Sequence, residues 1–172
     1  MEIRFAVAGD AEKLAMFGSE TFWDTYRGSD KLNPRDLRAY MSEAFSVSKI
    51  TKELNDPQTA FLIGEKNGRM AAYAKIVFQK SNGTVAGDSQ TELARIYVER
   101  SFRGKGFGIQ MLEKCLNEAV KAKSDVLWLG VWRYNERAIG FYEKHGFAIT
   151  GEIEFNLAGN IQKDFVMAKA LG

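Results

Sequence analysis

The segment from residue 91 to about residue 120 constrains the fold more than any other part of the chain. An apolar strand, Thr91–Glu99, runs into a turn that contains Gly104, Gly106 and Gly108, and an amphipathic helix follows at once. Glycine has no Cβ, so the backbone N–H groups of such a turn can converge on a ligand. The free N–H groups and partial positive charge of a helix start add to the attraction for anions. The segment therefore predicts a phosphate site between a strand and a helix.

Composition limits the class of protein around this site. The 172 residues suit one domain, 1–172, and 45% apolar with 27% charged residues is ordinary for a globular protein. The net charge of +2 gives no argument for a nucleic-acid or membrane partner. The single cysteine excludes an intrachain disulfide and a cysteine zinc cluster, and with one histidine we expect no metal site. Without a signal peptide or an apolar run long enough to span a bilayer, we expect a cytoplasmic protein.

The rest of the chain predicts strands and helices in an order typical of an α/β fold. Expected strands are 2–7, 59–65, 70–79, 91–99, 126–132, 147–153 and 161–168. Expected helices are 10–26, 34–45, 48–54, the segment after the glycine turn, and 135–145. Asn67-Gly68 predicts a tight hairpin, and the last two strands are expected to form a closing hairpin around Asn156–Asn160. This order indicates a mixed sheet with a meander first and a βαβ unit second.

Two common phosphate motifs do not fit the glycine turn. A P-loop needs Ser or Thr after Gly-Lys, but Gly104-Lys105 is followed by Gly106. A dinucleotide-binding turn needs a third glycine where Met111 stands, and it belongs to a first βα turn rather than one past the middle of the chain. Neither class of nucleotide site explains the turn.

Two blocks together resemble the GNAT superfamily of N-acetyltransferases. Arg103–Gly108 is similar to its R/Q-x-x-G-x-G/A turn, and Asn135–Phe147 is similar to its N-x-x-A-x-x-F-Y-x-K-x-G-F block about thirty residues later. The expected order of elements also fits that fold over nearly the whole chain. The resemblance implies a mixed, mostly antiparallel sheet flanked by helices, with splayed fourth and fifth strands. It also implies acetyl-CoA as the cofactor and an amine as the acceptor.

Weaker similarities extend the resemblance to the PaiA-type polyamine N-acetyltransferases. They lie in residues 20–26, 41–54, 128–132 and 167–169. This resemblance implies a small-molecule acceptor such as spermidine or spermine, acetylated by direct attack in a ternary complex. A protein or peptide N-terminus is the alternative acceptor, because one fold serves many amines. A non-catalytic coenzyme A-binding regulatory module is the alternative outside enzymes, and a homodimer stays open.

The resemblance also implies which residues hold the cofactor. Main-chain groups of Ile96, Tyr97 and Val98 would pair with the pantetheine arm. The pyrophosphate would lie on the turn residues Arg103, Gly104, Lys105, Gly106, Phe107 and Gly108. Two further candidates are Asn135 and Lys144. Asn135 is also suited to capping its helix, a role compatible with a cofactor contact. For Lys144 the alternative is a solvated position on the helix surface. Phe107 is also suited to packing at the start of its helix.

Tyr142 is the catalytic candidate. Aminolysis of a thioester expels a thiolate, and a nearby phenol can donate a proton to the sulfur while backbone N–H groups stabilise the oxyanion. The alternative is that Tyr142 only packs on one helix face. Cys115 is expected to be a core thiol rather than an acyl carrier, and His145 a helix-end residue rather than a base.

The acceptor site is less determined by the sequence. Trp23, Tyr26, Tyr73 and Trp132 are candidates for an aromatic pocket, with Glu20 or Asp24 attracting ammonium groups. Core packing is the default for each aromatic ring. Glu92 is a candidate general base acting through water, and a solvent-facing strand carboxylate is the alternative.

Overall fold

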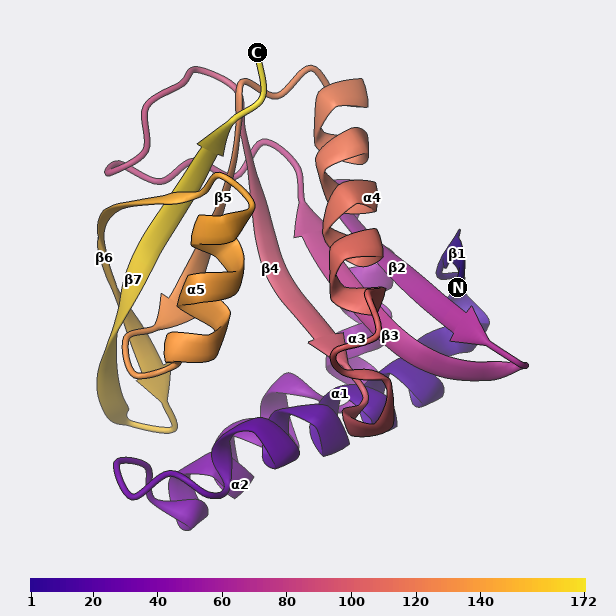
Figure 1. The fold of residues 1–172 in the computed structure, drawn as a ribbon. Coiled ribbons are helices and arrows are strands. Elements are labelled where there is room, and N and C mark those ends of the chain that lie inside the picture. Colours follow the sequence, from indigo (N-terminus) through magenta and orange to yellow (C-terminus); the bar gives the residue numbers. More distant parts are fainter.

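A seven-stranded sheet organises the computed structural model, which describes all of residues 1–172 (Figure 1). Its spatial order is β1-β2-β3-β4-β5-β7-β6, and only the β4–β5 pair is parallel. The strands are β1 Glu2–Phe5, β2 Thr59–Lys66, β3 Arg69–Val77, β4 Gln90–Val98, β5 Val126–Trp132, β6 Ala148–Leu157 and β7 Asn160–Ala170. The expected α/β fold with a mixed, mostly antiparallel sheet is confirmed.

Helices cover both faces of this sheet. They are α1 Ala11–Tyr26, α2 Pro34–Ala44, α3 Val47–Leu54, α4 Phe107–Lys121 and α5 Glu136–Lys144, with 3-10 turns at Ala8–Asp10 and Arg100–Phe102. The largest core cluster packs Met111, Leu112 and Cys115 of α4 and Tyr142 of α5 against one face. A second cluster packs α1 and α3 against the other face. Figure 1 shows α4 and α5 in front of the sheet, and α1 and α2 across its lower end.

Local sequence signals explain most element ends. Asn67 and Gly68 both have positive φ, at 52° and 73°, as the predicted tight hairpin requires. The Asn33 side chain accepts a hydrogen bond from Arg35 N and so caps α2 ahead of Pro34. Asn135 likewise caps α5, because its Oδ1 accepts from Ala138 N at 3.2 Å. The predicted hairpin at Asn67-Gly68 and the predicted cap at Asn135 are confirmed.

The predicted closing hairpin is present, but its first strand is longer than expected. We expected that strand to end at Ile153, whereas β6 continues to Leu157 and a two-residue turn follows at Ala158-Gly159, where φ is 51° and 93°. Asn156 Oδ1 accepts a hydrogen bond from Gly159 N at 2.6 Å, which holds the chain in this tight turn. Alanine is rare at positive φ, so the sequence concealed the turn type.

Strand β4 contains a bulge that decides which side chains face which helices. In the β3–β4 pairing Lys75 is opposite Arg95 and Ile76 is opposite Leu93, so Ala94 has no partner in β3. An extra residue reverses the side-chain alternation. Ile96 and Val98 therefore join Leu93 in packing on the cluster below α4 and α5, while Tyr97 packs on the α1 side.

Beyond the bulge the sheet opens. Strands β4 and β5 pair only over Gln90–Glu92 and Val126–Trp128, and the remaining lengths diverge (Figure 1). The opening leaves one backbone edge of each strand without a strand partner. The predicted splay of the fourth and fifth strands is confirmed. No helix of the structure is both long enough and apolar enough to cross a membrane.

Candidate active site

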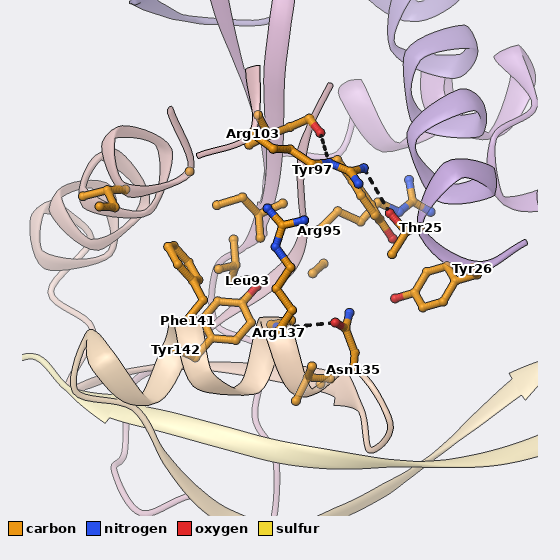
Figure 2. A pocket seen from close by; sticks show the side chains of 18 of the residues that line it. Thr25, Tyr26, Leu93, Arg95, Tyr97, Arg103, Asn135, Arg137, Phe141 and Tyr142 are labelled. Atoms are coloured by element: carbon orange, nitrogen blue, oxygen red, sulfur yellow. Dashed lines mark hydrogen bonds between the residues drawn. The ribbon is translucent and has the colours of Figure 1, made fainter. Parts of the chain in front are cut away.

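A cavity of about 410 Å³ lies where β4 and β5 separate, between α4, α5 and the end of α1. The walls include the second half of β4, the glycine turn, Gly130 and Val131 of β5, and the first two turns of α5 (Figure 2). Ile96, Tyr97 and Val98, which we predicted along the cofactor, are all among the lining residues. A cavity that combines apolar walls with a few polar groups is typical of a ligand site.

The glycine turn closes one end of this cavity with backbone. Gly104 and Gly106 have φ of 76° and 80°, the left-handed region that other residues rarely adopt. Gly106 is the N-cap of α4, and no side chain caps that helix end. Gly108 also lines the cavity, in van der Waals range of Phe141 and Val98. The first amides of α4 are thus left for an anion, as the sequence predicts.

Two arginines add positive charge to the same cavity. Arg103 Nε donates to Val98 O at 3.0 Å and its Nη2 to Thr25 Oγ1 at 3.4 Å, which fixes the guanidinium beside the end of β4 (Figure 2). Burial, and next the charge of Arg137, lower the pKa of Arg103. Sequence analysis missed Arg137, although its place two residues after the Asn135 cap puts it at a helix start. Like charges this close favour a multiply charged anion.

Tyr142 projects from α5 into the cavity beside Phe141 (Figure 2). Its residue surface is only 7% exposed, and burial raises the pKa of its phenol above the usual value. The phenol therefore stays protonated at neutral pH and can act as a proton donor. Packing is also present, because the ring lies edge-on to Phe147 at 5.6 Å.

Four other predicted cofactor residues lie at different distances from the cavity. Asn135 lines it while capping α5. Phe107 does not line it: the ring is buried and stacks on Phe102, with centroids 5.2 Å apart. Lys105 lies over the Phe102 ring, with Nζ 5.9 Å from its centroid, and Lys144 is exposed in the last turn of α5. Both lysine side chains lie outside the cavity wall.

A second cavity of about 190 Å³ lies on the opposite side of the opening. Its charged lining residues are Glu92, Glu154, Asp164 and the one cation Arg95. The aromatic rings that line it are Phe22, Tyr26, Tyr40, Tyr97, Trp128, Trp132 and Phe155. Acidic groups among aromatic rings suit a cationic ligand.

The two cavities share part of their walls. Tyr26, Ala94, Arg95, Tyr97 and Gly130 line both. Gly130 lies between Trp128 and Trp132 on the same face of β5 and supplies no side chain to fill the opening. The unpaired β4 and β5 edges therefore frame a passage through the sheet, with a cationic cavity on one side and an acidic one on the other.

The predicted acceptor residues separate into two groups. Tyr26, Glu92 and Trp132 line the second cavity, and the ring of Tyr26 lies edge-on to that of Trp132 at 5.8 Å. Tyr73 lines neither cavity, because it is 1% exposed in the core between Phe17 and Phe61. Trp23 is also outside, under the guanidinium of Arg38.

The predicted acidic groups of α1 do not reach the second cavity. Asp24 pairs with Arg27 at 3.1 Å, and Glu20 is exposed. Among the acidic residues that do line it are Glu154 of β6 and Asp164 of β7, which sequence analysis missed. Only the folded sheet shows that β7 lies next to β5 and β6 next to β7.

Other reactive groups lie apart from both cavities. Cys115 is fully buried, and burial raises its pKa to about 12. His145 caps the end of α5, where its Nδ1 lies 2.7 Å from Phe141 O. Nowhere do three or more His, Cys, Asp or Glu side chains gather as a metal ion would require.

Comparisons with known proteins agree with this architecture. An uncharacterized N-acetyltransferase of Lactobacillus delbrueckii subsp. lactis is 31% identical over 162 residues, which cover 94% of this chain and 92% of that protein. A spermine/spermidine N(1)-acetyltransferase of Bacillus subtilis is 31% identical over 65 residues, 37% of this chain and 43% of that protein. The crystal structure of PaiA N-acetyltransferase from Thermoplasma acidophilum in complex with coenzyme A superposes with a TM-score of 0.78 at 22% identity, covering 98% of both chains.

The family profile decides the assignment. The profile described as "Acetyltransferase (GNAT) family" matches residues 19–147, a span that includes both the glycine turn and α5. The two structural elements that line the larger cavity are therefore the ones that the profile covers. The chain belongs to the acetyltransferase (GNAT) family.

Proposed function

We propose that the protein transfers the acetyl group of acetyl-CoA to a primary amine, with a polyamine such as spermidine or spermine as the acceptor. The observation that carries this proposal is the passage between β4 and β5. It joins a cavity with a glycine turn to an aromatic and acidic cavity on the other side of the sheet. A thioester entering from the first side and an amine entering from the second would meet beside Ala94 and Gly130.

The first cavity suits coenzyme A along its length. Amides of the glycine turn, together with Arg103 and Arg137, provide a cationic cradle for a pyrophosphate. The unpaired edge of β4 at Ile96–Val98 offers main-chain groups to the amides of a pantetheine arm, as a neighbouring strand would. The PaiA structure from Thermoplasma acidophilum, which contains coenzyme A, supports this placement.

The reaction then needs two proton transfers. The amine nitrogen attacks the thioester carbonyl, and amides of the splayed β4 stabilise the oxyanion. The C–S bond breaks, and the departing sulfur takes the proton of the Tyr142 hydroxyl. Glu92 accepts, through water, the proton that the attacking amine must lose. Burial raises the pKa of Glu92, which makes it a better proton acceptor.

The absence of an accessible thiol supports direct attack in a ternary complex. Cys115, the one thiol, lies buried below α4 and lines neither cavity. A thiol with a pKa near 12 holds almost no thiolate at neutral pH. The amine itself is therefore the group that attacks the thioester.

The polyamine acceptor is supported by the chemistry of the second cavity. The carboxylates of Glu92 and Asp164, together with several aromatic rings, favour an aliphatic cation over an anionic or neutral acceptor. The partial match to the spermine/spermidine acetyltransferase of Bacillus subtilis agrees with this. A peptide N-terminus is the rival acceptor, and a volume of only about 190 Å³ favours the smaller amine.

A thiol-release assay tests the proposal. The protein is mixed with acetyl-CoA and, in separate reactions, spermidine, spermine and an unblocked peptide, while free thiol is monitored. We expect thiol release with the polyamines and little with the peptide. Release with the peptide alone would replace the acceptor. Tight coenzyme A binding without release for any amine would favour a non-catalytic binding module.

A further inference from the structure

Asp164 is a carboxylate to which the reaction described above gives no role. It lies on β7 directly opposite Trp132 of β5, and it lines the second cavity. Its Oδ1 is buried and has no hydrogen-bond partner. Leaving such an oxygen unpaired is costly, so most buried polar atoms have partners. An unpaired carboxylate oxygen in the wall of a cavity points to a ligand that donates hydrogen bonds.

The protein's own cations do not satisfy this carboxylate. Arg133, which follows Trp132 in the sequence, is the cation whose charge most affects Asp164. Its Nη2 pairs with Glu152, and its Nε donates to Lys163 O at 3.1 Å. No ion pair joins Asp164 to any Lys or Arg. The missing donor is therefore external to the chain.

The sheet fixes how far Asp164 lies from the reaction. It is opposite Trp132, two residues along β5 from Gly130, which lines both cavities. Two residues of strand and one inter-strand spacing separate their backbones by about 8 Å. An acceptor that reacts beside Gly130 and reaches Asp164 therefore needs a second polar group several bonds from its reacting nitrogen.

The walls between these two points describe the connecting atoms. The rings of Tyr26, Tyr40, Trp132 and Phe155 line the cavity and offer apolar surfaces to methylene groups. Glu92 of β4, which also lines the cavity, adds a second carboxylate to the wall that contains Asp164. The expected ligand is therefore an aliphatic chain that carries a cation at its far end.

We propose that Asp164 binds the second, non-reacting ammonium group of a diamine acceptor, and so makes the enzyme select dicationic amines over monocationic ones. This inference rests on the proposed acetyl transfer to an amine and names the residue that would set its selectivity. Asp164 is thus a specificity-determining residue, whereas Tyr142 and Glu92 serve the chemical steps. Burial raises the pKa of Asp164 to about 6, so the carboxylate is ionised at neutral pH when the cation arrives.

Two measurements test this role. The first is binding of 1,4-diaminobutane and of butylamine to the wild-type protein with coenzyme A bound, measured by calorimetry. The second is kcat/KM for the same two amines, measured by thiol release, in wild type, Asp164→Asn and the control Asp88→Asn. Asp88 is an exposed aspartate in the loop before β4 and makes no side-chain hydrogen bond or ion pair. Its variant removes the same charge away from the cavity.

We expect wild type and Asp88→Asn to prefer the diamine at least tenfold in both measurements. Asp164→Asn should lose this preference by reducing binding and kcat/KM for the diamine while leaving those for butylamine within about twofold. An unchanged diamine preference in Asp164→Asn, or no preference in the wild type, would overturn the inference.

Failure of the proposed function gives a different pattern. Preferential diamine binding that depends on Asp164, without thiol release from any amine, would overturn acetyl transfer and keep the diamine site. Thiol release from both amines at equal efficiency would keep acetyl transfer and overturn the site. The wild-type binding measurement does not depend on the variant, so equal binding of the two amines would overturn the inference even if Asp164→Asn does not fold.

Discussion

The two cavities that meet between β4 and β5 are built in different ways. The larger one takes most of its wall from two short parts of the chain, residues 93–109 and 130–142, and its phosphate end is made of backbone. The smaller one takes its wall from α1, α2, β4, β5, β6 and β7, and its chemistry comes from side chains. A site made of backbone leaves a compact sequence motif. A site assembled from distant side chains leaves none.

The cavities also differ in charge. Arg103 and Arg137 line the larger one, whereas Glu92, Glu154 and Asp164 line the smaller one. An anionic cofactor and a cationic acceptor are thus each attracted to a different side of the same sheet. The two cavities share wall residues at the opening in the sheet, where Gly130 carries no side chain. The following variants test this division, from the largest expected effect to the smallest.

Tyr142→Phe tests the proposed proton donor in the wall of the larger cavity. The hydroxyl makes no hydrogen bond in the protein, so its removal should leave Tm unchanged within about 2 °C while kcat falls about a hundredfold. Steady-state kinetics and thermal unfolding check both parts. If kcat is unchanged, Tyr142 takes no part in the chemistry and only packs.

Gly106→Val tests the backbone end of the larger cavity. A valine at φ of 80° costs about 2 kcal/mol, so we expect the turn to relax and its amides to diverge. The Kd for coenzyme A should then rise about 30-fold, as measured by calorimetry.

Gly140→Ala is the matched control for this variant. Gly140 is an exposed helical residue of α5 where an added Cβ meets no atom within 4 Å. Its substitution should leave the Kd unchanged. Equal Kd values for Gly106→Val and wild type would mean that the glycine turn is not the phosphate site.

Gly130→Val tests the passage. An added Cβ lies 3.7 Å from Ile153 Cγ2, an ordinary contact, and valine is favoured in strands, so the fold should tolerate it. The side chain would narrow the opening on the acceptor side. We expect kcat/KM for the amine to fall about tenfold with the Kd for coenzyme A within twofold of wild type. Equal losses for both ligands would argue that one shared cavity binds them.

Asp164→Asn tests the cost of keeping an unpaired carboxylate in the acidic cavity. The folded-state pKa of about 6 is above the ordinary value of 3.8, so folding favours the protonated form. The stabilisation from that proton is present below about pH 4 and is lost as the pH rises through 6. At pH 7.5 the free energy of unfolding of the variant should therefore exceed that of wild type by about 1 kcal/mol after allowance for partial exposure, and its Tm should be higher. At pH 3.5 the two proteins should be equally stable.

Thermal unfolding across this pH range checks the sign of the effect. A lower Tm for Asp164→Asn at pH 7.5 would show that the carboxylate has a structural partner. The excess stability of the variant should also disappear when 1,4-diaminobutane saturates the wild type, because bound ligand stabilises the folded state.

Sequence reasoning was most successful where local chemistry decides the conformation. Asn67-Gly68, the Asn135 cap and the turn from Arg103 to Gly108 each carry their own signal in adjacent residues. It was least successful where packing decides. Tyr73 and Trp132 are both aromatic residues on strands, yet Tyr73 is enclosed in the core and Trp132 lines the acidic cavity. The bulge at Ala94, which sets the facing of Ile96 and Val98, has no residue of unusual conformation to announce it.

By itself the sequence determined the order of elements, the glycine turn and the family, because these depend on short-range spacing and on backbone freedom. The tertiary structure decided the opening between β4 and β5, the enclosure of Tyr73, and the placement of Glu92, Glu154 and Asp164 around one cavity. Strand order caused this difference: β7 inserts between β5 and β6 and brings residue 164 beside residue 132. Such long-range pairing arises only when the whole sheet buries its two faces together.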